Sequence, residues 1–216
     1  MKILVYEGPR KLVVEEVKDF PMNDDEMRIR TLYTGVSHGT EMNVYRGDAP
    51  FFNRRNAYDI RLFRPASTDE KWNYPIRSCD PDVWYMGYAN VGEVVETGRN
   101  IKNIKAGDIV YSNAPHQSMI IKKENEVRVL PKNLKPECGV FYTNLMTTFN
   151  AILDSRIKLG DNVAISGLGT MGQLLVQLAK MSGALNVYGI DLLDKRLETA
   201  LINGADKVYN PMEVED

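Results

Sequence analysis

Residues 162–172 read NVAISGLGTMG, and this stretch decides the fold of the last third of the chain. Its first five residues, bounded by glycine, are typical of a buried strand, and an apolar run continues past the third glycine to about Ser182. The apolar run is long enough and regular enough to predict a helix. The stretch therefore predicts a strand, a tight glycine turn and a helix, in the order that opens a βαβ unit.

Two more strands and one more helix follow the glycine turn. A strand at 186–190 ends on Asp191, a helix at 194–203 closes with Gly204, and a short strand occupies 207–209. This βαβαβ order is that of the mononucleotide-binding half of a doubly wound parallel sheet.

Each glycine of the turn has a physical reason in a dinucleotide site. Gly167 permits the tight turn, Gly169 lets the backbone approach a diphosphate, and Gly172 lets the helix pack closely against the strand. The helix N-terminus then offers N–H groups and a positive dipole end to the phosphates. The alternative is a plain packing loop. The predicted cofactor contacts are Gly167, Leu168, Gly169, Thr170, Met171, Gly172, Asp191 and Arg196.

Asp191 stands about 20 residues after the glycines, where an acid holds the ribose hydroxyls of a dinucleotide. Its carboxylate would repel a ribose 2′-phosphate, so NAD(H) is favoured over NADP(H). Lys195 and Arg196 lie close by in sequence and weaken this preference slightly.

The first part of the chain has the character of short β-strands broken by glycine and proline. Strands are predicted at 2–6, 12–17, 26–34, 89–96, 108–111, 118–121 and 126–129, with a glycine-containing loop after residue 34. The spacing of apolar residues becomes helical near residue 137, and 137–153 is predicted as one helix or two short ones. We therefore expect a β domain at 1–145 and an α/β domain at 146–216.

Residues 48–86 form a long segment rich in aromatic side chains. Connections of this length are unusual in compact domains. The aromatic residues favour a small satellite core under a long loop, and a role in lining a substrate pocket is the alternative. They are Phe51, Phe52, Tyr58, Phe63, Trp72, Tyr74, Trp84 and Tyr85.

The composition excludes several classes of protein. The 216 residues are 44% hydrophobic and 26% charged, with a net charge of −2, so nucleic-acid and membrane-surface roles are disfavoured. No apolar stretch approaches the ~18 residues of a spanning helix, and the N-terminus lacks a secretory signal. Cys79 and Cys138 match no CxxC spacing, and two free thiols indicate a reducing cytoplasm.

Several ordered stretches resemble the medium-chain dehydrogenase/reductase family, also called alcohol-dehydrogenase-like. They are TGVSHGTE at 34–41 with YRG at 45–47, GYANVGEVV at 87–95, KAGDIV at 105–110, TTFNAI at 147–152, LGD at 159–161 and the glycine turn. The fold that this resemblance implies is a GroES-like β domain followed by a Rossmann domain. It also implies an oxidoreductase acting on an alcohol, polyol or carbonyl compound, and a homodimer for the full-length protein.

The departures from the family pattern concern zinc. The positions matching the three catalytic zinc ligands carry Ser37, Tyr88 and Thr143, and the acid that supports the metal is replaced by Ala89. A catalytic zinc requires three Cys, His or carboxylate ligands, so no zinc is expected. The pattern SxGTE with GYxxVG resembles the branch that contains bacteriochlorophyllide-type dehydrogenases.

Other groups must then serve the developing alkoxide. Tyr88 is the first candidate and Ser37 and Glu41 the second, with core or supporting roles as the alternative for each. By resemblance, His38 would contact the cofactor diphosphate or be a plain loop histidine. Thr147 would lie near the nicotinamide carboxamide or cap a helix.

Three rival functions remain open at this point. They are a zinc alcohol dehydrogenase with displaced ligands, an NADPH-dependent quinone or enoyl reductase, and a truncated nucleotide-binding module without catalysis. Family members continue with further sheet strands, so the sequence corresponds to their N-terminal two-thirds.

Overall fold

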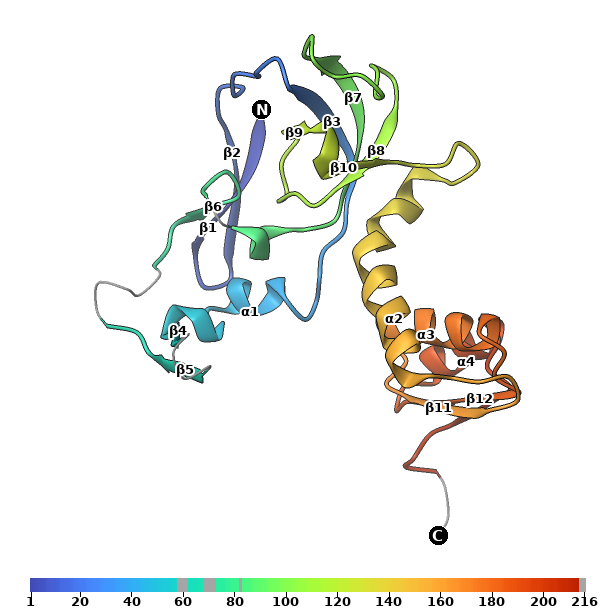
Figure 1. Ribbon diagram of the computed structural model, residues 1–216. Helices are drawn as coiled ribbons and strands as arrows, with labels where there is room; N and C mark the ends of the chain where they lie inside the picture. The colour runs from blue at the N-terminus through green and yellow to red at the C-terminus, as the bar shows by residue number, and fades with distance from the viewer. Residues whose placement is uncertain (58–61, 68–72, 82, 214–216) are drawn as a thin grey trace. The chain divides into compact units, whose positions relative to one another are not determined.

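The computed structural model describes residues 1–57, 62–67, 73–81 and 83–213 (Figure 1). The chain forms two compact units, Met1–Phe141 and Tyr142–Asp216. The first is mainly β and the second alternates strands with helices, so the predicted order of a β domain followed by an α/β domain is confirmed. The units meet in sequence between Phe141 and Tyr142, whereas the sequence placed the boundary after residue 145.

The first unit is organised around an antiparallel sheet. Within the described residues it has the strand order β10-β8-β7-β3-β9. Alternate side chains of these strands, including Met27, Ile29 and Val94, are fully buried and form the core. The strands are β3 (Glu26–Thr34), β7 (Asn90–Thr97), β8 (Ile109–Ser112), β9 (Met119–Lys123) and β10 (Val127–Val129).

A second, smaller antiparallel sheet has the order β2-β1-β6. It consists of β1 (Lys2–Gly8), β2 (Lys11–Glu16) and β6 (Ile76–Arg77), so the strands predicted at 2–6 and 12–17 are confirmed, and they pair as an N-terminal hairpin. A separate hairpin joins β4 (Arg54–Ala57) to β5 (Leu62–Pro65). The short helices are α1 (Glu41–Arg46), η1 (Pro50–Phe52), η3 (Trp84–Met86), η4 (Glu124–Glu126) and η5 (Pro136–Phe141).

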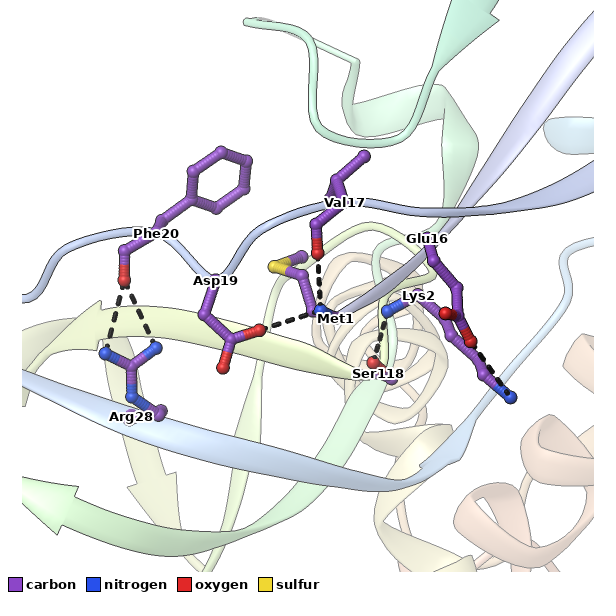
Figure 2. Close-up of polar contacts among 8 residues, drawn as sticks. All are labelled: Met1, Lys2, Glu16, Val17, Asp19, Phe20, Arg28 and Ser118. Atoms are coloured by element: carbon purple, nitrogen blue, oxygen red, sulfur yellow. Dashed lines mark hydrogen bonds and ion pairs between the residues drawn. The ribbon is translucent and has the colours of Figure 1, made fainter.

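The start of β1 is fixed to the rest of the first unit by polar contacts (Figure 2). The amino group of Met1 donates to the carbonyl of Val17 and pairs with Asp19 Oδ1, both at 2.7 Å. The backbone N–H of Lys2 donates to Ser118 Oγ at 2.7 Å. These contacts tie the start of β1 to the segment that follows β2 and to the residue before β9.

The aromatic-rich segment contributes a small core of its own. The rings of Phe51 and Tyr85 lie 4.7 Å apart, and those of Phe52 and Tyr74 lie 5.2 Å apart. The satellite-core interpretation is confirmed for these four residues, whereas Phe63 is exposed. Tyr58, Trp72 and the side chain of Trp84 lie outside the described residues.

The second unit is a three-stranded parallel sheet, as far as the structure describes it, in the order β11-β12-β13. Helices α3 and α4 connect its strands and lie on one face, with α2 packed against α3 (Figure 1). Its core is a cluster of small and branched side chains that includes Val176 and Val187. The elements are α2 (Tyr142–Ser155), β11 (Asn162–Ser166), α3 (Thr170–Met181), β12 (Asn186–Ile190), α4 (Asp194–Ile202) and β13 (Lys207–Tyr209).

Two features differ from the expectation. The loop predicted after residue 34 contains α1, a helix of only six residues whose glycine-rich surroundings concealed its period. The region 137–153 forms η5 followed by α2, which agrees with the two-helix alternative. Among the described residues, no helix is long and apolar enough to cross a membrane.

Candidate functional site

The glycine turn between β11 and α3 has the conformation that its residues demand. Gly167 has φ of +85°, a left-handed value that other residues rarely adopt, and its N–H donates to the carbonyl of Ile190 at 2.8 Å. A Cβ atom at Gly172 would lie 2.0 Å from the carbonyl oxygen of Gly167. Glycine is therefore required at both positions by the protein's own packing.

Gly169 is different, because nothing in the protein requires it. Its φ of −71° and ψ of −165° suit any residue, and a Cβ atom there would meet no atom within 4 Å. Gly169 is also the N-cap of α3, a 12-residue helix without a side-chain cap or an acid in its first turn. The first N–H groups of α3 thus face open space suited to an anion.

Leu168 anchors the turn to the core of the second unit. Its side chain is 1% exposed, although it lies between two glycines at a strand-to-helix turn. A Cβ atom at Gly189 on β12 would come within 3.0 Å of Leu168 Cδ1, so glycine there makes room for this side chain. The packing of Leu168 in the hydrophobic core therefore holds the turn in place.

The carboxylate of Asp191 holds the same turn by hydrogen bonds. One carboxylate oxygen, Oδ2, accepts the N–H of Leu168 at 2.7 Å and lies 3.3 Å from Arg196 Nη1. The other, Oδ1, accepts the N–H of Leu193 at 3.0 Å. Burial would raise the pKa of Asp191, but the hydrogen bonds from Leu168, Leu193 and Arg196 outweigh it and lower the pKa. The carboxylate therefore stays ionised at neutral pH.

A buried polar cluster occupies the first unit at the start of α1. Glu41 is 1% exposed, and its Oε1 accepts the backbone N–H of Ser37 at 2.9 Å. Its Oε2 lies 2.6 Å from Nε2 of His116, which is also buried. Of the three proton-donor candidates, Ser37 and Glu41 are thus brought into contact, with His116 as a third member.

His116 continues this cluster to Thr34. The second ring nitrogen, Nδ1, lies 2.6 Å from Thr34 Oγ1. A carboxylate at Glu41 can only accept, so Nε2 of His116 donates to it, and Nδ1 bonds the Thr34 hydroxyl in the role that the form of the ring leaves to it. The order Glu41, His116, Thr34 is therefore a continuous hydrogen-bonded chain.

Tyr88 lies in the loop between η3 and β7. It is half-buried, and its carbonyl oxygen accepts the hydroxyl of Tyr111 at 3.0 Å. The preceding Gly87 has φ of +115°, and a Cβ atom there would lie 2.9 Å from the backbone nitrogen of His116. Close packing of this loop against His116 therefore fixes the backbone on which Tyr88 is carried.

His38 and Thr147 stand apart from these clusters in the contacts that they make. His38 is exposed in the loop before α1, and its predicted diphosphate contact stays a prediction. Thr147 lies in α2 and donates its hydroxyl to the carbonyl of Thr143 at 3.1 Å. The helix-cap alternative for Thr147 is wrong, because the residue lies inside the helix; a role near the nicotinamide stays a prediction.

Comparison with known proteins finds that the chain is similar to dehydrogenases. Residues 170–216 match the family model described as zinc-binding dehydrogenase. The chain is 29% identical over 215 residues to D-guloside 3-dehydrogenase from Escherichia coli, covering 98% of this chain and 60% of the relative. It is 24% identical over 243 residues to (R,R)-butanediol dehydrogenase from Bacillus subtilis, covering 100% of this chain and 65% of that relative. The chain thus spans about three fifths of the length of the curated relatives it matches.

The solved structures agree in fold. Galactitol-1-phosphate dehydrogenase from Escherichia coli aligns with a TM-score of 0.74 and 21% identity, over 100% of this chain and 62% of that one. 2R,3R-butanediol dehydrogenase from Bacillus subtilis aligns with a TM-score of 0.76 and 21% identity, over 100% and 64%. These findings support the resemblance to the medium-chain dehydrogenase/reductase family, which is alcohol-dehydrogenase-like. Its units are accordingly a GroES-like β domain and a Rossmann domain.

The residues at the three positions that match the family's catalytic zinc ligands are of types that rarely bind zinc. Ser37, Tyr88 and Thr143 offer hydroxyl groups, whereas zinc is bound by thiolate, imidazole or carboxylate. In the part of the chain that the structure describes, no three His, Cys, Asp or Glu residues gather closely enough to hold a metal ion. Glu41 and His116 supply only two such groups, and they bind each other.

The predictions from sequence did not include His116. It is one of only two histidines in the chain, and that rarity was the available signal. Its partner Glu41 is 75 residues away in sequence, so no local pattern connects them.

Proposed function

We propose that this chain carries the cofactor- and substrate-binding residues of an NAD(H)-dependent oxidoreductase acting on an alcohol, polyol or carbonyl compound without a catalytic zinc. One observation carries the proposal: a glycine turn with open space at Gly169, beside the ionised carboxylate of Asp191. The names of the relatives, D-guloside 3-dehydrogenase and (R,R)-butanediol dehydrogenase, support a hydroxyl-bearing substrate.

The residues of the second unit would divide the cofactor between them. The N–H groups at the start of α3 would bind the diphosphate, and Asp191 would accept hydrogen bonds from the adenosine ribose. Each carboxylate oxygen can accept more than one hydrogen bond. Oδ2 already accepts from Leu168 and Arg196, so the acceptor capacity for a ribose lies mainly on Oδ1, which accepts the N–H of Leu193. When bound, the nicotinamide would accept or supply a hydride.

The residues of the first unit would handle the proton. Tyr88, placed on a loop that packs against His116, is the leading donor for a developing alkoxide, and Ser37 is the second. Glu41 would act through Ser37, because its carboxylate already accepts the Ser37 N–H and contacts His116. We further propose that His38 contacts the diphosphate and that Thr147 lies near the nicotinamide.

Replacing Asp191 with alanine tests the cofactor site. We expect Asp191→Ala to weaken NADH binding by more than tenfold, about 1.4 kcal/mol, because the ribose loses its acceptor and the Leu168 N–H loses its partner. Fluorescence titration with NADH and NADPH measures both dissociation constants. The preference for NADH over NADPH should also fall, because the repelling carboxylate is gone.

Asp154→Ala is the matched control, since it removes an exposed aspartate from the same unit. Circular dichroism would confirm that both variants fold. Equal NADH affinity for wild type and Asp191→Ala would contradict the proposed site.

Arg196 favours a second candidate, an NADPH-dependent reductase. Its guanidinium group is 49% exposed and lies 3.3 Å from Asp191 Oδ2, where it could meet a ribose 2′-phosphate. Tighter binding of NADPH than of NADH by the wild-type chain would favour this candidate over the first.

Metal analysis tests the zinc-free part of the proposal. We expect purified protein to carry well below one zinc per chain, because hydroxyl groups occupy the matched ligand positions. Elemental mass spectrometry after exhaustive dialysis gives the ratio. Stoichiometric zinc, lost together with activity on chelation, would instead support a zinc dehydrogenase with displaced ligands.

A further inference from the structure

Gln173, in the first turns of α3, makes three side-chain hydrogen bonds beside the proposed cofactor site. Its Nε2 donates to the carbonyl of Leu168 at 3.0 Å and to the carbonyl of Arg196 at 2.9 Å. Its Oε1 accepts Nδ2 of Asn203, at the end of α4, at 2.9 Å. The side-chain amide is thereby fully engaged with the glycine turn and with both ends of α4.

These bonds close a ring with those of Asp191. The Leu168 peptide donates its N–H to Asp191 and offers its carbonyl to Gln173. Arg196 bonds Asp191 through its guanidinium group and Gln173 through its carbonyl. Asp191 and Gln173 therefore each join the glycine turn to the first turn of α4.

We propose that Gln173 is a positioning residue that sets the spacing between the diphosphate-binding turn and the ribose-binding carboxylate. This inference rests on the proposed function, because it takes one dinucleotide to contact both the glycine turn and the Asp191 carboxylate. A ligand that spans diphosphate and ribose must match the spacing, whereas a ligand that occupies only the ribose side need not. Fixing the two halves before binding reduces the ordering cost of the spanning ligand.

The test compares ADP-ribose, which spans both halves, with adenosine, which lacks the diphosphate. Gln173→Met keeps length, charge and helix propensity and removes all three hydrogen bonds. We expect ADP-ribose binding, measured by calorimetry, to weaken at least fivefold, and adenosine binding, measured by ligand-observed NMR, to change less than twofold. A variant that only loosens the fold would weaken both ligands together.

Gln177→Met is the matched control, with the same substitution one turn later on an exposed side chain that donates to the Gln173 carbonyl. It should leave both affinities within twofold of wild type. Asn203→Ser keeps Gln173 and removes its fixing donor, and we expect a smaller loss in the same direction, so the proposal stays testable if Gln173→Met does not fold.

The outcomes separate this inference from the function on which it rests. Wild-type protein that binds neither NADH nor ADP-ribose overturns both. Wild-type protein that binds ADP-ribose, with folded Gln173→Met or Asn203→Ser equal to it, overturns only the positioning role. An equal loss of ADP-ribose and adenosine affinity in Gln173→Met also overturns it.

Discussion

Gly169→Val is expected to weaken NADH binding at least about a hundredfold while leaving the free energy of unfolding almost unchanged. The backbone at Gly169 is extended and a Cβ atom there would meet no atom within 4 Å, so a side chain can begin at this position without a backbone clash. The branched side chain would occupy the space that we assign to the diphosphate. Loss of two hydrogen bonds to charged phosphate oxygens, each about 1.5–3 kcal/mol, corresponds to roughly that factor.

Fluorescence titration and urea denaturation provide the two measurements. Gly8→Val is the matched control, because a Cβ atom at Gly8 also meets nothing within 4 Å and the site lies in the N-terminal hairpin. It should bind NADH like wild type. Tight NADH binding by folded Gly169→Val would place the diphosphate elsewhere and remove the main support for the proposed function.

His116→Leu is expected to lower the free energy of unfolding of the first unit by about 3 kcal/mol. Glu41 is only 1% exposed, and the substitution removes the imidazole ring that its carboxylate contacts. The N–H of Ser37 continues to contact Glu41, which keeps the expected loss at the lower end for a broken buried pair.

A double-mutant cycle with Glu41→Leu isolates the pair itself. We expect the double variant to lose at least about 1 kcal/mol less than the sum of the single losses, because neither buried side chain of the pair then remains without the other. Both tryptophans of the chain precede residue 142, so urea denaturation followed by tryptophan fluorescence reports on the first unit. His38→Leu, at the exposed histidine, should change stability by less than about 0.5 kcal/mol. Additive losses would contradict the pairing.

The parts of the site that could be predicted from sequence are those fixed by local backbone demands. Gly167 and Gly172 follow from a positive φ and from the close approach of α3 to the turn, and both demands act within six consecutive residues. Asp191 was predictable because the strand that carries it and the glycine turn belong to one repeating βα pattern.

The parts that could not be predicted depend on contacts between distant segments. Glu41 and His116 meet only because β3, β8 and β9 lie in one sheet and bring their connecting loops together. Gln173 is polar in the middle of an apolar helix pattern, and such a residue is ordinarily assigned to the solvent face. Only the positions of α4 and the turn reveal that its amide is occupied.

In the proposed cofactor site Asp191 would have two roles, and these constrain any attempt to redirect the protein toward NADP(H), with its ribose 2′-phosphate. Exchanging this acid for a small neutral residue would remove the repulsion of a ribose 2′-phosphate. It would also leave the Leu168 N–H without its acceptor and remove the carboxylate that the Arg196 side chain contacts. A successful redesign must therefore supply a substitute acceptor for that amide, such as a serine or asparagine oxygen, along with the new cationic contact. The proposed selectivity between NADH and NADPH and the shape of the glycine turn would both depend on the Asp191 carboxylate.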